Sequence, residues 1–306
     1  MPYDLTKPLV IGISSRALFD LEKENEIYEK NGLEAYIQYQ IENEQMILQP
    51  GAGFELIKAF LRLNENEQQK HLVEVIIMSR NSPDTSLRIF SSIEKYGLDI
   101  TRAALTGGAS VAPYLQSFHT DLFLSANHED VQDAINNGVA AGILLTNSAH
   151  PEKKNRIDQI RIAFDGDAVL FGTEAERIFQ QSGIEAFKEH ERNHANEPLS
   201  RGPFANFLAA LSNIQAMVPG RDNAPIRTAL VTSRNAPAHE RAIKTLRAWN
   251  VRIDEAFFLG GVTKREILDK FGAHIFFDDQ EVHTDSAATV VPAAVVPYRV
   301  GDDPSK

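Results

Sequence analysis

One segment of this chain occurs twice. Met78-Ser79-Arg80-Asn81-Ser82-Pro83 recurs as Thr232-Ser233-Arg234-Asn235-Ala236-Pro237, at an offset of 154 residues (232 − 78). Nearer the start of each copy, Asn31-Gly32-Leu33-Glu34-Ala35-Tyr36 recurs as Ser182-Gly183-Ile184-Glu185-Ala186-Phe187, at an offset of 151 (183 − 32). A chain with such a repeat is expected to fold as two similar units. Residues that both copies keep point to the scaffold, and residues that one copy alone carries are candidates for chemistry.

Each half alternates short apolar runs with longer amphipathic stretches, a pattern typical of strands and helices around a mostly parallel sheet. The apolar runs are continuous, which favours strands that are buried on both faces. We predict an α/β protein built from two tandem Rossmann-like units with helical insertions. The expected strands lie near residues 9–13, 75–78, 103–105, 122–124 and 141–145 in the first half, and near 162–164, 228–231, 256–259, 275–277 and 293–296 in the second.

A polar stretch with a proline, residues 147–155, separates the two patterns and predicts domains 1–150 and 151–306. In each half a long helical pattern follows the first strand. In the second half it covers about residues 172–226, with Phe204, Phe207, Leu208 and Leu211 at helical spacing. So long an insertion is unusual for a plain crossover, and it could form a helical cap over the strand ends.

Composition excludes several classes of protein. The 306 residues include no cysteine, which excludes disulfides and thiolate metal sites. The formal net charge of −11 argues against a general nucleic-acid binder. No apolar run approaches the ~18 residues of a membrane span, and no signal peptide is visible, so we expect a cytoplasmic protein with no membrane partner.

The strongest local motif is Asp165-Gly166-Asp167, at the end of an expected strand. Two aspartates at this spacing can direct one carboxylate and one carbonyl to a cation, which leaves the other carboxylate free as an acid or base. An Asx turn that closes the strand is the structural alternative. A second pair, Asp278 and Asp279, follows a very apolar strand, where carboxylates are costly unless they are solvated, paired or bound to metal.

Thr232 and Lys264 are the other candidates. A hydroxyl at a strand end suits a phosphate oxygen, although Thr232 could instead cap the following helix. Lys264 could neutralise phosphate charge, although a lysine near a helix start is ordinarily a solvated surface group.

The internal repeat unites these candidates. Opposite Asp165, Asp167, Thr232, Lys264, Asp278 and Asp279, the first copy has Ser14, Arg16, Met78, Ser110, Leu124 and Ser125. Independent solvated loops would not need to change as a set, so we predict one shared site in the second half and a catalytically silent first half. The triplet Ser233-Arg234-Asn235 recurs in the silent copy, which favours a structural turn, although Arg234 could still touch a ligand.

These motifs resemble the haloacid dehalogenase-like phosphohydrolases, which have an Asp-x-Asp motif, a Thr or Ser, a Lys and a late acidic pair in this order. The chain is more specifically similar to the cytosolic 5′-nucleotidase I family, the AMP-preferring type. The similarity rests on residues 14–19, 163–171, 189–191, 198–199, 202–203 and 274–280, and it covers nearly the whole chain. Ser79-Arg80-Asn81 departs from it, since a less basic turn is expected there.

The resemblance implies a Mg²⁺-dependent phosphatase for nucleoside 5′-monophosphates, with AMP or IMP favoured. Asp165 would be the nucleophile that forms an aspartyl-phosphate, and Asp167 the general acid and base. Thr232 and Lys264 would bind the phosphoryl oxygens, and Asp165, Asp167, Asp278 and Asp279 would hold the metal. Candidate substrate-binding residues are Ser233, Arg234, Phe187, His190, Asn196 and Arg201, together with Glu191 and His194; Phe187 also fits a core position.

Two other functions stay open. One is a phosphatase for sugar phosphates or other small phosphoesters, and the other is a nucleotide-binding regulatory protein with the first half as sensor. The resemblance also implies that ADP can act as an effector. The oligomeric state, a homo-oligomer included, does not follow from the sequence.

Overall fold

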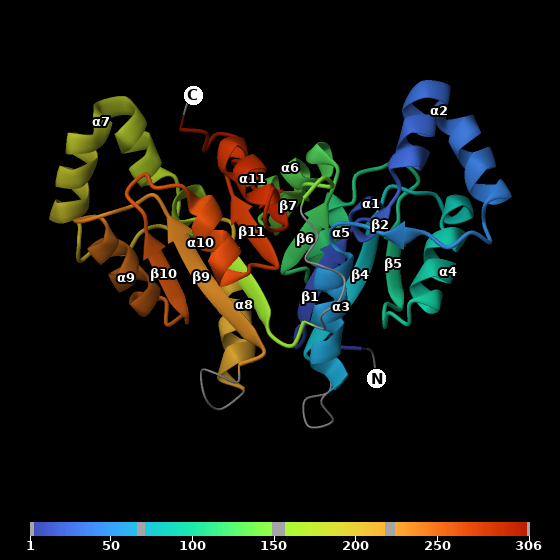
Figure 1. Ribbon diagram of the computed structural model, residues 1–306, viewed down its shortest axis with the longest axis horizontal. Coiled ribbons are helices and arrows are strands. Elements are labelled where there is room, and N and C mark those ends of the chain that lie inside the picture. Colours follow the sequence, from blue (N-terminus) through green and yellow to red (C-terminus); the bar gives the residue numbers. More distant parts are fainter. Residues whose placement is uncertain (1–2, 66–70, 149–156, 218–223, 305–306) are drawn as a thin grey trace. The chain divides into compact units, whose positions relative to one another are not determined.

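The computed structural model describes residues 3–65, 71–148, 157–217 and 224–304, and the chain forms two compact units, 1–139 and 140–306 (Figure 1). The predicted domain boundary, between residues 150 and 151, lies within 149–156, outside the described residues. The strand β7 (Ala140–Leu144), which we expected at the end of the first domain, groups with the second unit. Within the described residues, no helix is long and apolar enough to span a bilayer.

The first unit contains a parallel four-stranded sheet in the order β6-β1-β4-β5. Its strands are β1 (Leu9–Ile13), β4 (Val73–Ser79), β5 (Arg102–Leu105) and β6 (Leu122–Ser125), and a short antiparallel pair joins β2 (Phe19–Asp20) to β3 (Gln49–Pro50). Its helices are α1 (Ser15–Leu18), α2 (Glu22–Glu42), α3 (Phe54–Arg62), α4 (Leu87–Lys95), α5 (Ala112–Ser117) and α6 (His128–Asn136), with 3₁₀ turns at Leu63–Glu65 and Pro83–Thr85.

The second unit contains the sheet β10-β9-β8-β11-β12-β7, which is parallel except for the β12–β7 pair. Its strands are β8 (Ile160–Phe164), β9 (Ile226–Thr232), β10 (Glu255–Phe258), β11 (Ile275–Asp278), β12 (Ala293–Val295) and β7. Its helices are α7 (Glu174–Asn193), α8 (Ala205–Ala216), α9 (His239–Ala248), α10 (Lys264–Phe271) and α11 (Glu281–Ala288), and a π turn, η3, spans Gly166–Leu170. The predicted α/β class and mostly parallel pairing are confirmed.

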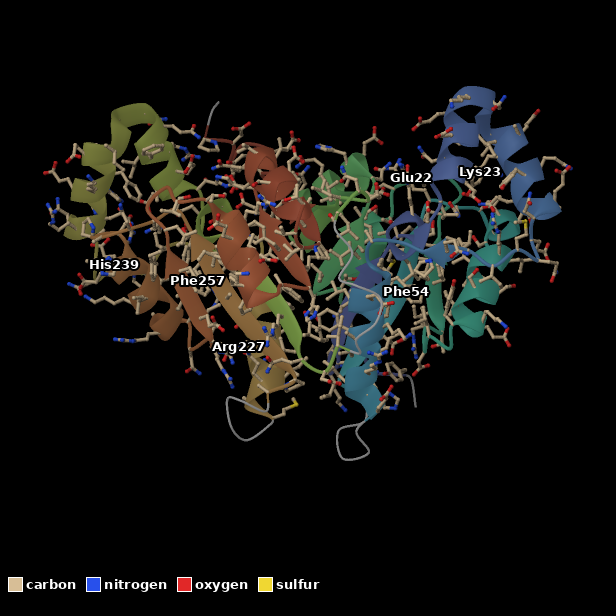
Figure 2. The ribbon with its side chains drawn as sticks, viewed as in Figure 1. Glu22, Lys23, Phe54, Arg227, His239 and Phe257 are labelled. Carbon is tan, nitrogen blue, oxygen red and sulfur yellow. The ribbon has the colours of Figure 1, made fainter. Side chains whose placement is uncertain are left out.

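Apolar side chains fix the central strands of the second unit. Phe164 on β8 stacks on Phe277 of β11 with ring centroids 5.7 Å apart, and Phe204 lies 4.6 Å from the same ring. Figure 2 labels one side chain from each of the neighbouring strands β9 and β10, Arg227 and Phe257. Phe257 of β10 packs against the core, and Arg227, near the start of β9, pairs with Glu255 at 2.7 Å. Burial on both faces thus follows from the continuous apolar runs, since water-excluding helices cover such sheets.

The strands of the two copies follow the same order, β6-β1-β4-β5 and β11-β8-β9-β10, and their spacing corrects our alignment. The strands β1 and β8 differ by 151 residues (160 − 9), but β4 and β9, β5 and β10, and β6 and β11 all differ by 153 (226 − 73, 255 − 102, 275 − 122). Our offset of 154 was therefore one residue too long at the strand ends. The identical Ser-Arg-Asn letters misled the alignment, because the second copy has one more residue between its strand and the proline.

The long helix of each unit breaks at the same glycine. Gly32 in α2 has φ 84° and ψ −179°, and Gly183 in α7 has φ 79° and ψ −179°. This backbone conformation is almost restricted to glycine. The motif that both copies share around Gly32 and Gly183 therefore encodes a bend, which is visible in α7 in Figure 1.

The predicted cap region, 172–226, divides into two helices with different positions. The bent helix α7 runs from Glu174 to Asn193, whereas α8 packs its buried side chains, Phe207, Leu208 and Leu211 among them, next to β9. Gln215 near the end of α8 donates to the Ile226 carbonyl of β9 at 3.2 Å. The helix α8 is thus a crossover helix on the sheet, and α7 alone remains as the candidate cap.

We expect Gly183→Ala to destabilise the protein by about 1–3 kcal/mol, because a β-carbon disfavours the backbone angles of the bend. The measurement is the free energy of unfolding in urea. The neighbouring Ser182→Ala is the matched control and should change that free energy by less than about 0.5 kcal/mol. Equal effects of the two substitutions would show that the bend does not require glycine.

Candidate active site

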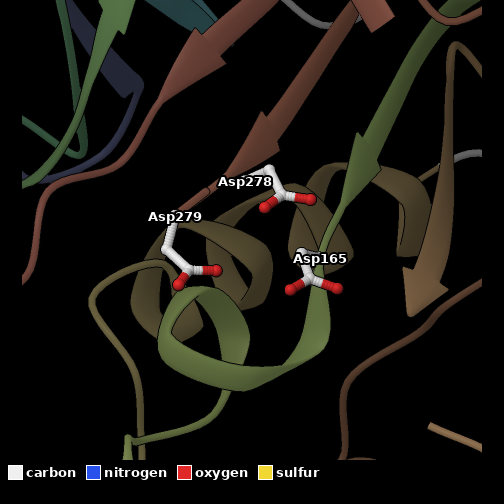
Figure 3. Close-up of side chains that lie close together, drawn as sticks. All are labelled: Asp165, Asp278 and Asp279. Atoms are coloured by element: carbon white, nitrogen blue, oxygen red, sulfur yellow. The ribbon is translucent and has the colours of Figure 1, made fainter. Parts of the chain in front are cut away.

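The predicted acidic residues meet at the carboxyl ends of two parallel strands. Asp165 directly follows β8, Asp278 ends β11 and Asp279 follows it (Figure 3). One carboxylate oxygen from each of these three residues lies within 4.8 Å of the others. In a parallel sheet the strand ends converge on one edge, so residues far apart in the sequence come together there.

Asp165 occupies the N-cap position just before the turn η3, but its side chain makes no capping hydrogen bond. Its backbone N–H donates to the Phe277 carbonyl at 2.8 Å, which fixes the residue between β8 and β11. The first unit has Ser14 at this place, and the Ser14 hydroxyl caps its turn by accepting the Ala17 N–H at 3.2 Å. Asp165 makes no such cap. Its carboxylate is therefore free to face the other charges of the site.

Lys264, the first residue of α10, lies between two of the carboxylates. Its Nζ is 2.8 Å from Asp165 Oδ1 and 2.6 Å from Asp278 Oδ2. The Lys264 side chain is only 4% exposed, and the Asp278 side chain is fully buried. Burial opposes a charged lysine, but the two carboxylates outweigh it and raise the pKa of Lys264. The predicted surface alternative for Lys264 is therefore excluded.

Asp278 has two hydrogen-bonding partners besides Lys264. Oδ1 accepts the Gln280 N–H at 2.9 Å, and the His283 ring nitrogen lies 3.2 Å from it. Burial alone would raise the pKa of Asp278, but the hydrogen bond from His283 and the charge of Lys264 lower it. Ser125 accepts the N–H two residues ahead, at 3.1 Å, at the same place in the first unit. Asp278 thus combines a turn role that both copies share with a charge that only the second copy has.

Asp165 and Asp279 are the two carboxyl groups of the site whose pKa values are raised. Burial and the charges of Asp278 and Asp167 raise the pKa of Asp165 to about 7, against the opposing charge of Lys264. Burial and the charges of Asp165 and Asp278 raise the pKa of Asp279 to about 8, although Tyr298 donates a hydrogen bond to Asp279. When all three carboxylates are ionised, they outnumber the single ammonium and the site is negative. A bound cation would relieve this repulsion.

The same group of residues fits a metal ion. Asp165 Oδ1 is buried and has no hydrogen bond of good geometry, although Lys264 lies next to it. Carboxylate oxygens and waters are the ligands that hard divalent cations prefer. The identity of the metal does not follow from these ligands alone.

Asp167 lies in the π turn, and its carboxylate contacts a buried arginine. The turn has one more residue than its counterpart α1, since Phe19 and Phe171, which end the two turns, differ by 152 residues (171 − 19) while the strands before them differ by 151. Ala168 takes up the change with φ 62°. The Arg234 Nε and Nη2 donate to the two Asp167 oxygens at 2.8 Å each.

Thr232 ends β9 beside the turn. Its hydroxyl accepts the Arg234 N–H at 3.2 Å, as the Ser79 hydroxyl accepts the Asn81 N–H in the first unit. A β-carbon on Gly166 would lie 3.0 Å from Thr232 Oγ1, so the glycine of Asp-x-Asp permits this close approach. Thr232 is buried and replaces Ser79, not Met78.

The corrected alignment also changes three other pairs but keeps the conclusion drawn from them. Lys264 stands against Val111, Asp278 against Ser125 and Asp279 against Ala126, instead of Ser110, Leu124 and Ser125. The first unit still has no carboxylate and no lysine at these places. Arg234 corresponds in the structure to Asn81 and not to Arg80. The repeated Ser-Arg-Asn sequence therefore does not mark equivalent positions.

The predicted substrate-binding residues are spread over α7, the segment after it and the β9–α9 turn. Ser233 is exposed, whereas Arg234 is 3% exposed, and Phe187 lies in a small buried cluster with Ala175 and Ala238. The remaining side chains are engaged as follows: His190 stacks on His194 at 4.1 Å, Asn196 accepts from Lys244 at 2.7 Å, Arg201 lies over Trp249 at 5.2 Å, and Glu191 is fully buried between Arg234 and Arg241.

The sequence missed His283 and Tyr298 as partners of the acidic pair. His283 lies in the first turn of α11, five residues after Asp278, and this spacing was the signal available. Tyr298 lies beyond β12 and carries no motif of its own.

Fold and site together define an α/β protein with a candidate cation site at the carboxyl ends of parallel strands. The chain matches the family model described as 5′-nucleotidase over residues 1–303, and it belongs to this family. It is 38% identical over 288 residues to cytosolic 5′-nucleotidase 1B of Homo sapiens. The matched region covers 91% of this chain and 47% of that protein. The chain thus spans about half the length of this relative. No solved structure matches it.

The raised pKa values of Asp165 and Asp279 predict a pH dependence of stability in the absence of divalent metal. The folded state keeps protons that the unfolded chain releases near pH 4, so the free energy of unfolding should fall as the pH rises from about 4 to about 8. Asp279→Asn removes one titrating group. In urea unfolding with EDTA, it should reduce the loss of stability between pH 5 and pH 8 by about 1 kcal/mol or more. An unchanged or steeper loss in this variant would contradict the assignment.

Proposed function

We propose that this protein is a 5′-nucleotidase that hydrolyses nucleoside 5′-monophosphates to nucleoside and phosphate. The observation that carries the proposal is the buried contact of Lys264 with both Asp165 and Asp278, beside Asp279 and Thr232. Membership of the 5′-nucleotidase family and the likeness to a cytosolic 5′-nucleotidase support the same reaction. The relative's name also supports the proposal of a cytoplasmic location. From the motifs we further propose two haloacid dehalogenase-type units, of which the first, 1–150, is catalytically silent.

In this proposal Asp165 attacks phosphorus and forms an aspartyl-phosphate, while the bond from phosphorus to the 5′-oxygen breaks. Asp167 gives its proton to that oxygen, and it later takes a proton from the water that hydrolyses the intermediate. Lys264 and Thr232 hold phosphoryl oxygens as their charge redistributes. Asp165, the Asp167 carbonyl, Asp278 and Asp279 would bind Mg²⁺, which would neutralise the charge of the phosphate and of the carboxylates.

The raised pKa of Asp165 bears on this role, because a nucleophile must be ionised. At neutral pH a group with a pKa of about 7 is only partly ionised. A cation beside Asp165 favours its charged form and so makes it a better nucleophile near neutral pH. The negative site is therefore consistent with an enzyme that works only after it has bound metal.

The helix α7 and the segment after it are the proposed base and ribose site. Ser233, Asn196 and Arg201 are exposed and His190 is partly so, and these side chains remain the candidates for direct contact. Phe187 and Arg234 are buried and engaged with each other, since the guanidinium lies 5.7 Å from the ring centroid. We therefore assign Phe187 and Arg234 to the structural support of the site. We also propose ADP as an effector, but we assign no residues to its binding.

Asp165→Asn should lower kcat for AMP by about 10³-fold or more, because the amide cannot form the phosphoenzyme. Phosphate release with Mg²⁺ at pH 7 is the measurement, and the unchanged far-UV circular dichroism spectrum is the check on folding. Ser14→Ala, at the same place in the silent unit, is the control and should leave kcat within about 2-fold. Near-normal activity of Asp165→Asn would exclude the mechanism.

The substrate class is tested with AMP, IMP, deoxynucleotides and sugar phosphates, each with and without Mg²⁺. We expect release from nucleoside monophosphates that EDTA removes and Mg²⁺ restores. Faster release from sugar phosphates would favour the wider phosphatase. Tight nucleotide binding without any release would favour a regulatory protein.

A further inference from the structure

The same buried strap ties the bent helix to the rest of each unit. Arg88 on α4 and Arg241 on α9 hold corresponding places (241 − 88 = 153), and the Nε of each donates to a backbone carbonyl after the bent helix, at 2.7 Å for Met46 and 2.9 Å for Glu197. In the first unit, Arg88 Nη1 donates to buried Glu24 of that helix at 2.5 Å and to buried Gln40 at 3.5 Å. In the second unit, Arg241 Nη1 donates to buried Glu191 at 2.8 Å. Because both copies keep this strap, it is part of the scaffold.

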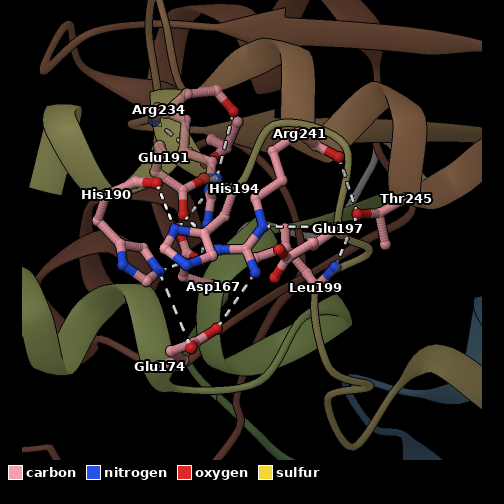
Figure 4. Close-up of polar contacts among 12 residues, drawn as sticks. Asp167, Glu174, His190, Glu191, His194, Glu197, Leu199, Arg234, Arg241 and Thr245 are labelled. Atoms are coloured by element: carbon pink, nitrogen blue, oxygen red, sulfur yellow. Dashed lines mark hydrogen bonds and ion pairs between the residues drawn. The ribbon is translucent and has the colours of Figure 1, made fainter.

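The two copies place the buried carboxylate of this strap at different positions of the bent helix. It is Glu24 in the first unit, where the second has Ala175, and Glu191 in the second, where the first has Gln40. In the first unit the Gln40 amide donates to the Tyr36 hydroxyl at 3.0 Å. In the second unit one Glu191 oxygen accepts from Arg241 at 2.8 Å, and the other accepts from Arg234 Nη1 (Figure 4). Glu191 is fully buried, so its charge is balanced by these two arginines.

Arg234 also differs between the copies, since the first unit has Asn81 at its place. The guanidinium lies 5.7 Å from the ring centroids of both Phe171 and Phe187, and Nη1 also donates to the Ala238 carbonyl at 3.2 Å. Its remaining donors face Asp167 as a fork, with both bonds at 2.8 Å. The two aromatic rings, the Ala238 carbonyl and Glu191 thus fix the position of the Arg234 guanidinium. The guanidinium in turn orients the Asp167 carboxylate through its two hydrogen bonds.

From this difference between the copies we infer that Arg234 and Glu191 are positioning residues for Asp167, through which the bent helix α7 orients the acid–base group. The inference rests on the proposed function. As a carboxylate, Asp167 accepts both bonds of the fork. When it carries the proton for the 5′-oxygen, it keeps one bond, so the side chain stays in place while the proton leaves with the nucleoside. In the second step the same orientation receives a proton from the attacking water.

The chain itself supplies the test substitution. Glu191→Gln introduces the residue of the silent unit, which keeps the shape and an acceptor for Arg241 but removes the charge that holds Arg234. Gln40→Leu is the matched control, because it removes a buried polar group from the bent helix of the first unit.

The readout compares AMP with its 5′-thio analogue, in which sulfur bridges the nucleoside and the phosphoryl group. The thiolate leaves without a proton, so only AMP needs an oriented acid. Glu191→Gln should slow phosphoenzyme formation in single turnovers by about 10- to 100-fold with AMP and by less than about 3-fold with the analogue, with KM little changed. Gln40→Leu should change neither rate by more than about 2-fold.

Equal losses with both substrates, or no loss with AMP, would overturn the positioning role. Should Glu191→Gln fail to fold, Arg234→Lys keeps the charge but has no fork, and it should give the same selective loss. Failure of the proposed function is recognised separately, because the wild-type protein would then release no phosphate from AMP that depends on Asp165.

Discussion

The buried ammonium of Lys264 is the interaction on which the second unit's site depends. It joins the start of α10 to Asp165 after β8 and Asp278 at the end of β11, with both distances below 3 Å. Without that positive charge, two carboxylates would lie buried beside each other at a cost of several kcal/mol. The lysine does not balance the whole site, however, because Asp279 adds a third carboxylate. The fold therefore holds the cluster together and leaves it in need of one more cation.

Most of the fold follows from simple patterns in the sequence. The expected strands agree with the observed ones because strands buried on both faces need continuous apolar runs, and such runs are easy to read. The roles of α7 and α8 were harder to separate, since both have helical periodicity and only the packing shows that α8 lies on the sheet. The exact alignment of the repeats also needed the structure. Identical letters around Arg80 and Arg234 outweighed a one-residue difference in loop length that hydrogen bonds then revealed.

The candidate site divides in the same way. Asp165, Asp278, Asp279 and Lys264 were predictable as a group, because strand ends converge and charges after apolar strands are costly. Arg234 could not be assigned from the sequence, since its partners Asp167 and Glu191 lie 67 and 43 residues away and no spacing rule connects them. Long-range buried ion pairs of this kind depend on how helices pack, and a single sequence records that only indirectly.

The extra residue in the turn η3 has an implication for the history of the two copies. Side chains at the first unit's strand ends could be exchanged one by one for those of the second, but Ala168 has no counterpart to exchange. The left-handed residue changes the path of the backbone, and with it the direction in which Asp167 leaves the chain. A set of point substitutions would therefore not turn the first unit into a working copy of the second. The two halves are separated by the length of a loop as well as by chemistry, and a change of length is a rarer event than a change of side chain.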